Sequence, residues 1–192
     1  MPVTFYLLRH AQGWHNAPPP DFKGDSYNDI KFRDAELTPL GIMQTVERRK
    51  EFEHKEFDAI YCSPMRRCRQ TLLGVYPQAA NMNVQVDDRL IEQPTGVNIS
   101  DHRFERNTIV ANSPPSWDLT KVAENNPFLV RSVTRDAENI RTITQEIFKK
   151  YGGQNGTVLI VAHGMWIGRW LEMYQDHCQF INNCEYVKYT LN

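Results

Sequence analysis

Two short, almost entirely apolar runs near opposite ends of the chain limit most strongly how this sequence can fold. Residues 3–8 (VTFYLL) and 157–162 (TVLIVA) are rich in β-branched, aromatic and aliphatic side chains. Strands buried on both faces have this composition, and they occur mainly in parallel sheets that helices cover on both sides. The two runs therefore predict central strands of a parallel sheet in an α/β fold.

Helix signals alternate with strand signals along the rest of the chain. Thr38 and Pro39 form a cap-then-proline pair at the start of a helix, and Ser63 and Pro64 repeat that pair. The expected helices cover residues 39–54, 64–73 and 165–174, with another between Thr134, as its cap, and the glycines at 152 and 153. The expected strands cover residues 3–8, 57–62, 84–86, 157–162 and, at an edge, 185–191. This order predicts a three-layer α/β/α sandwich with a mostly parallel central sheet.

Two segments show no helical or strand period. Residues 12–33 are polar and contain three consecutive prolines, which indicates a long loop of the kind that is often functional. Residues 93–131 contain more prolines and only short helical possibilities, so they predict a small lid insertion over the sheet. Because no change in composition marks a boundary, residues 1–192 are expected to form a single domain.

Composition excludes several classes of protein. The 192 residues include 23 acidic and 22 basic side chains, a balance that argues against binding to nucleic acid or to an anionic membrane surface. A hydrophobic share of 41% disfavours disorder, and no run is long enough to cross a bilayer or to serve as a secretory signal. The four cysteines lack a C-x-x-C pair and are expected to be reduced thiols, with disulfides left open by their even number. A cytoplasmic location is expected, with the nucleus also open.

Charged and imidazole side chains follow the predicted strands, at the sheet edge where α/β proteins bind ligands. They are Arg9 and His10, residues 63–67, Glu92, and His163 with Gly164. Arginine matches phosphate oxygens with its planar fork, so this set predicts an anion site. Zinc held by His10, His15 and His163 would be electrostatically costly beside two arginines, so no metal is expected.

Other phosphate and hydrolase chemistries lack their sequence patterns. The chain has no G-x-x-x-x-G-K-[ST] loop, no G-x-G-x-x-G turn after a strand and no G-x-S-x-G elbow. A thiol phosphatase loop starting at Cys62 would need an arginine at the position that Cys68 occupies. An imidazole therefore remains as the candidate nucleophile.

Five motifs occur in an order that resembles the histidine phosphatase superfamily, also called the phosphoglycerate mutase-like family. They are LRHAQGWHN at 8–16, LTPLG at 37–41 followed by Gln44, SPMRRCRQT at 63–71, LIE at 90–92 and VAHG at 161–164. Each motif alone is weak, since Arg-His pairs are common, but the ordered set covers positions 8 to 164 and is specific.

The resemblance implies a role for each matching residue. His10 would be the nucleophile that becomes phosphohistidine, and Glu92 would be the general acid and then the general base. Arg9, Arg67 and His163 would surround the phosphoryl group, with Asn16 adding a contact. Arg67 is selected because the family places its arginine four positions after the serine. No cofactor is implied, and the expected partner is a small phosphorylated substrate; the oligomeric state is not predicted.

Departures from the family pattern leave some roles open. Ala11 replaces the usual glycine, and Gln12 and Gly13 replace a commoner acidic-hydroxyl pair, so Gln12, Gly13, Trp14 and His15 are expected to form a substrate loop. Asp87, Asp88 or Glu105 could replace Glu92. Arg66 and Arg69 are interpreted as a solvated helix face. A phosphatase is favoured over a mutase because the chain is short; a non-catalytic binding module is the remaining alternative.

Overall fold

A computed structural model describes residues 2–94, 97–125, 133–175 and 179–192 of the chain. Its strands are β1 (Val3–Arg9), β2 (Ala59–Cys62), β3 (Val84–Asp87), β4 (Asp118–Lys121), β5 (Thr157–Ala162) and β6 (Tyr186–Leu191). Its α-helices are α1 (Pro39–Phe52), α2 (Arg66–Val75), α3 (Arg106–Ala111), α4 (Val133–Tyr151) and α5 (Gly164–Gln175). The strand order β4-β3-β2-β5-β1-β6 is parallel except for β6, which runs antiparallel to β1 at the edge. The predicted α/β class and mostly parallel sheet are confirmed.

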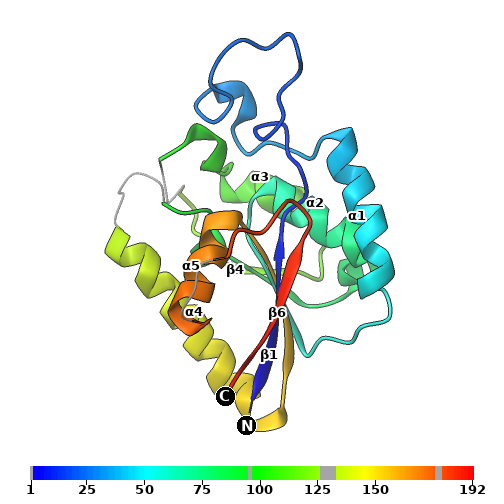
Figure 1. Ribbon diagram of the computed structural model, residues 1–192, viewed down its shortest axis with the longest axis vertical. Coiled ribbons are helices and arrows are strands. Elements are labelled where there is room, and N and C mark those ends of the chain that lie inside the picture. The colour runs from blue at the N-terminus through cyan, green and yellow to red at the C-terminus, as the bar shows by residue number, and fades with distance from the viewer. Residues whose placement is uncertain (1, 95–96, 126–132, 176–178) are drawn as a thin grey trace.

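Helices cover both faces of the sheet (Figure 1), with α1 and α2 on one side and α4 and α5 on the other. Alternation along β1 separates the two cores: Tyr6 and Leu8 pack with Leu72 of α2, while Phe5 and Leu7 pack with the other layer. The second layer is closed by large side chains of α4 and α5, namely Ile140, Ile143, Ile147, Trp166 and Trp170. β1 is thus buried on both faces, as its composition predicts.

Of the three predicted helix caps, the structure confirms one and contradicts two. Thr38 caps α1 as predicted, and its hydroxyl accepts a hydrogen bond from the Gly41 amide at 3.0 Å. Ser63 does not cap α2, because that helix begins at Arg66 rather than at Pro64. The first amide of α2, on Arg66, donates instead to Oδ1 of the buried Asp34 at 2.7 Å. Thr134 is not a cap either, because α4 includes Val133 and Thr134 therefore lies within the helix; its side chain lies outside the part of the chain that the structure describes.

The segment expected to be an irregular lid contributes a strand to the sheet. β4, within residues 93–131, pairs parallel with β3. This strand has only four residues, and all of them are at least partly exposed, so its sequence carries no alternating apolar signal. The expected role of the segment as a lid stays a prediction, and residues 95–96 and 126–131 of it lie outside the described ranges.

Two further findings concern the cysteines and the helices. Cys62, Cys68 and Cys184 are buried free thiols, while Cys178 lies outside the described residues. In the part of the chain that the structure covers, every helix is too short or too polar to cross a membrane.

Candidate active site

The predicted site residues meet at the carboxyl ends of the strands. β1 ends at Arg9 and leads into His10, and its neighbour β5 ends at Ala162 and leads into His163. The His10 amide donates to the Ala162 carbonyl at 3.0 Å, and the His10 and His163 ring centroids lie 5.2 Å apart. Parallel pairing of β1 and β5 thus places two imidazoles side by side.

His10 is held as a neutral imidazole with one ring nitrogen available. Its side chain is buried, and Nδ1 lies 2.8 Å from the Ala11 carbonyl oxygen, which can only accept a hydrogen bond. Nδ1 therefore carries the proton, and Nε2 keeps its lone pair. Burial, followed by the charges of Arg67 and Arg9, lowers the pKa of His10 well below its usual value. The carbonyl of His10 is fixed by the Cys184 amide and by Asn183 Nδ2, each at 3.1 Å.

Arg67 is a fully buried cation with an acidic partner. Its Nη2 donates to Asp101 Oδ1 at 2.8 Å, and its Nη1 donates to the Ser100 carbonyl at 2.9 Å. The two side chains of the ion pair are 1% and 4% exposed. Such a pair is expensive to break because the remaining charge would be buried without a counterion.

We expect Asp101→Asn to lower the free energy of unfolding by about 2–4 kcal/mol, because Asn keeps an acceptor for Arg67 but removes the compensating charge. Urea denaturation of wild type and variant measures this change. Asp21→Asn, at an exposed position, is the control that should leave stability unaltered. Equal stability of Asp101→Asn and wild type would show that the buried pair does not stabilise the fold.

His163 links the arginine to the end of β2. Arg67 Nη2 lies 3.3 Å from Nδ1 of His163, and because arginine only donates, Nδ1 must accept. The other nitrogen, Nε2, lies 2.9 Å from the Ser63 hydroxyl and is then the donor of that hydrogen bond. Burial, followed by the charge of Arg67, lowers the pKa of His163 well below its usual value. His163 is therefore neutral and fixed in one tautomer.

Arg9 is held by three contacts at the edge of the site. Its Nη1 donates to the Ile181 carbonyl at 2.7 Å, and its guanidinium carbon lies 5.3 Å from the ring centroid of Phe180. The third contact is the packing of the guanidinium against Gly164. A Cβ built at this glycine would lie only 3.2 Å from Arg9 Nε, so the lack of a side chain there leaves room for Arg9. Nε itself is buried and makes no hydrogen bond within the described residues.

Glu92 sits at the N-terminus of α5. Its carboxylate accepts hydrogen bonds from the amides of Gln93 at 2.9 Å and Trp166 at 3.1 Å, with Met165 at 3.4 Å. Burial, reinforced by the charge of Asp101, outweighs these contacts and raises the pKa of Glu92 to about 7. A carboxyl group with such a pKa can both donate and accept a proton near neutral pH.

Only some residues of the loop that follows His10 point toward the candidate site. Gln12 is turned toward α1, where its Oε1 accepts the Thr38 hydroxyl at 2.8 Å. His15 is 3% exposed, and its ring centroid lies 5.6 Å from that of His10. Gly13 leaves room for that ring, because a Cβ there would lie 2.9 Å from His15 Nδ1. Trp14 is half-buried.

Asn16 is bound to the same loop. Its Oδ1 accepts the Gly13 amide at 3.2 Å, and its Nδ2 donates to the Tyr27 hydroxyl at 3.3 Å. The Asn183 amide lies 3.4 Å from Asn16 Oδ1 and connects the loop to the backbone of His10. These hydrogen bonds fix the side chain of Asn16 relative to both the loop and the backbone of His10.

Sequence reasoning was wrong about Arg69 and missed three supporting residues. Arg69 is 5% exposed and donates to the carbonyls of Pro64 at 3.0 Å and Asn112 at 2.7 Å, so it is not on a solvated face. Arg66 is half-buried, 3.7 Å from Glu36. The missed residues are Ser63 as a partner of His163, Asp101 as a partner of Arg67, and Asn183 as a contact of His10.

The other candidate acids have partners elsewhere. Asp87 pairs with Arg89 at 2.7 Å, and Asp88 pairs with Arg103 at 2.8 Å. Glu105 has a side chain that is 60% exposed. Three imidazoles do gather here, but the described residues include no group of His, Cys, Asp or Glu that could hold a metal ion.

Residues 5–180 match the histidine phosphatase superfamily (branch 1). The chain belongs to this superfamily. It is 31% identical over 159 residues, 83% of this chain and 72% of the relative, to a Hydrogenobacter thermophilus protein named "Putative phosphoserine phosphatase 2". The predicted family is therefore confirmed, and relatives with phosphatase names support a phosphatase.

Two solved structures share the fold of this superfamily member. Phosphoglycerate mutase from Bacillus anthracis aligns with a TM-score of 0.69 at 17% identity, covering 99% of this chain and 88% of that one. Phosphoserine phosphatase from Entamoeba histolytica, solved with 3-phosphoglyceric acid, aligns with a TM-score of 0.61 at 19% identity, covering 97% and 89%. At these identities the likeness shows the fold alone.

Proposed function

We propose that this protein hydrolyses a phosphomonoester through a phosphohistidine intermediate on His10, with Glu92 as general acid and base. The observation that carries the proposal is the state of His10. Its Nδ1 is bound to the Ala11 carbonyl, so a neutral Nε2 lone pair is available among cationic groups. A nucleophile of this kind needs no base to activate it.

In the first step, His10 Nε2 attacks phosphorus and a P–N bond forms. The P–O bond to the leaving alcohol breaks, and the alcohol oxygen takes the proton of Glu92. Arg9 and Arg67 stabilise the negative charge on the other phosphoryl oxygens, a contribution of about 3–4 kcal/mol for a single well-placed donor. His163, whose two ring nitrogens bind Arg67 and Ser63, holds the Arg67 guanidinium in place. Glu92 ends this step as a carboxylate.

In the second step, the Glu92 carboxylate removes a proton from water, and the water oxygen attacks the phosphohistidine. The P–N bond breaks, inorganic phosphate leaves, and His10 regains its lone pair while Glu92 regains its proton. Because the guanidinium groups of Arg9 and Arg67 meet the phosphoryl charge, we propose that the reaction requires no metal ion.

The test is to give the purified protein a radiolabelled aryl phosphate in EDTA at mildly acidic and neutral pH. We expect release of phosphate and an acid-labile label that peptide mass spectrometry locates on His10. Binding without turnover would indicate a binding module, and transfer of the label to a phosphoglycerate acceptor rather than to water would indicate a mutase. Either of these results, or turnover that chelation abolishes, would contradict the proposal.

We expect Gly164→Ala to lower kcat/KM about tenfold, because the new Cβ would press on the Arg9 guanidinium, 3.2 Å from Nε, and displace it. Gly153→Ala is a matched control, since a Cβ there meets no atom within 4 Å. Steady-state kinetics with an aryl phosphate compares the two variants. Equal activity in both variants would show that the position of Arg9 does not depend on the space that Gly164 leaves beside it.

A further inference from the structure

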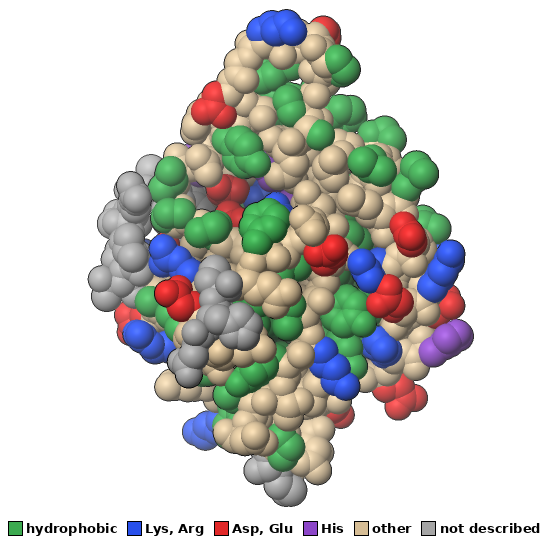
Figure 2. All heavy atoms as spheres, viewed as in Figure 1, with side chains coloured by type: hydrophobic (Ala, Val, Ile, Leu, Met, Phe, Trp, Pro, Cys, Tyr) green, Lys and Arg blue, Asp and Glu red, His purple; other side chains and the backbone are tan. Residues whose placement is uncertain are grey.

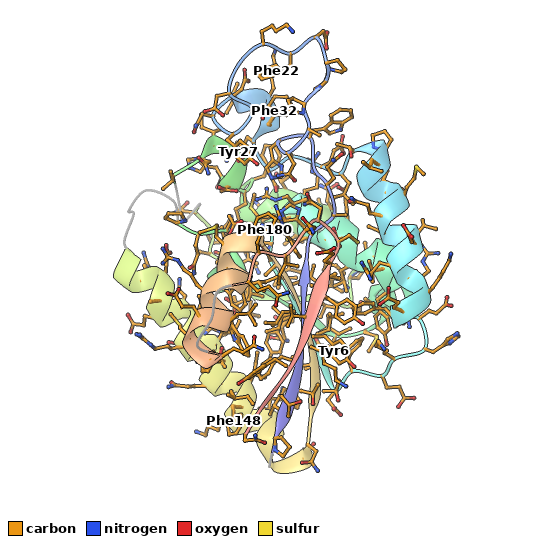
Figure 3. All side chains as sticks on the ribbon, viewed as in Figure 1. Tyr6, Phe22, Tyr27, Phe32, Phe148 and Phe180 are labelled. Atoms are coloured by element: carbon orange, nitrogen blue, oxygen red, sulfur yellow. The ribbon has the colours of Figure 1, made fainter. Side chains whose placement is uncertain are left out.

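Phe180 is an exposed aromatic ring placed on the candidate phosphate site. Its exposed fraction is 76%, the highest among the exposed large hydrophobic side chains of the described residues. Its ring lies over the guanidinium of Arg9, 5.3 Å from the guanidinium carbon. Figure 3 places Phe180 near the carboxyl end of β1, and Figure 2 shows hydrophobic, acidic and basic side chains close together in the middle of this face. The ring therefore offers an open aromatic face directly beside the candidate phosphate site, on which a flat group could stack.

A second exposed apolar side chain lies beside Glu92. Met165 is 53% exposed, and its amide lies 3.4 Å from Glu92 Oε2. Its backbone therefore adjoins the carboxylate that would protonate the leaving group, and its side chain is open to solvent. Methionine adapts readily to the shape of an aromatic partner.

A third apolar group, Tyr27, approaches from the long loop. Its ring lies edge-on to that of His15, with centroids 5.5 Å apart, and it is 42% exposed. Its hydroxyl accepts a hydrogen bond from Asn16 Nδ2 at 3.3 Å, and the His15 ring that it contacts lies 5.6 Å from the His10 ring, so the phenol stands beside the candidate nucleophile. Phe180 and Tyr27 belong to segments far apart in sequence, yet Phe180 lies over Arg9, the last residue of β1, and Tyr27 packs against His15 in the loop that follows this strand.

We propose that Phe180, Met165 and Tyr27 form an entrance that binds a flat, apolar leaving group, so that the substrate is an aromatic phosphomonoester rather than a small phosphorylated acid. The inference rests on the proposed function. A carboxylate-bearing leaving group would need a cation at the entrance, whereas these three side chains offer hydrocarbon and ring faces. A planar group would stack on Phe180 while its phosphate enters beside Arg9.

The kinetic test compares phenyl phosphate with phosphoserine and 3-phosphoglycerate for wild type, Phe180→Ala and Phe180→Leu. We expect wild type to favour phenyl phosphate in kcat/KM, and Phe180→Ala to raise KM for that substrate about three- to tenfold while its kcat changes little. Phe180→Leu keeps hydrocarbon over Arg9 and should be intermediate. Met43→Ala, at a 67% exposed position on α1, is the control.

An equal loss on all three substrates would overturn the inference, because Phe180 would then only support Arg9. A wild-type preference for phosphoserine or 3-phosphoglycerate would overturn it too. Calorimetry on His10→Ala with phenylphosphonate and methylphosphonate separates this result from the proposed function, since binding needs no turnover. Tighter binding of phenylphosphonate that Phe180→Ala removes supports the aromatic entrance even in an inactive protein, and equal binding of the two phosphonates contradicts it.

Discussion

Replacing His10 by alanine is expected to lower kcat for phosphomonoester hydrolysis by about 10⁴-fold or more, with no phosphoenzyme formed. The imidazole removed belongs to the only side chain that bonds to phosphorus in the proposed mechanism. Arg9, Arg67 and His163 have partners of their own in Ile181, Asp101 and Ser63, so the pocket keeps its shape. The variant should therefore still bind phosphate analogues such as tungstate, although it turns over no substrate.

The measurement combines release of phosphate from an aryl phosphate, analogue binding and thermal unfolding. His54→Ala is the matched control, because that histidine side chain is 89% exposed and only approaches Glu53. It should match wild type in all three readouts. Turnover by His10→Ala at a rate near that of wild type would remove His10 from the mechanism, whereas loss of analogue binding would show that its ring is needed to shape the pocket.

The layers and the meeting point of the site could be predicted from the sequence because both follow from local signals. β1 and β5 are nearly continuous apolar runs, so their composition predicts that they are buried between helices. Parallel strands end at one edge, which is enough to bring His10 and His163 together without knowledge of any contact. The helix cap at Thr38 is equally local, since it depends on residues 38–41 alone.

The supporting contacts of the site could not be predicted, because they join segments that carry no period. Asp101 lies 34 residues from Arg67, at the end of a three-residue 3-10 helix (Ile99–Asp101), and nothing in the neighbouring sequence marks it as a counterion. In the sequence, Arg69 resembles a surface arginine. In the structure it is covered because it donates to the carbonyl of Asn112, which lies 43 residues further along the chain. Ser63 has the pattern of a helix cap, and only the position of His163 shows which partner it takes.

Glu92→Gln is expected to lower kcat by about 10²- to 10⁴-fold on an alkyl phosphate, because glutamine can neither protonate the leaving alkoxide nor activate water. With nitrophenyl phosphate, whose leaving group departs without a proton, the first step should survive and the second should not. Stopped-flow kinetics should then show a burst of nitrophenolate followed by slow turnover. Glu105→Gln is the control, since that side chain is 60% exposed, and it should behave as wild type.

The pKa of Glu92, about 7, fixes the sign of the pH dependence. The first step with an alkyl phosphate needs the protonated acid, so kcat/KM should be highest at acidic pH and should fall as the pH rises through about 7. His10 imposes no limit near neutrality, because its pKa lies well below the usual value for histidine. Asp101 raises the pKa of Glu92, so Asp101→Asn should move this fall to lower pH, and nitrophenyl phosphate should show little of it. An identical pH profile in Glu92→Gln, measured on its residual activity, would assign the titration to the substrate or to another group and remove Glu92 as the acid.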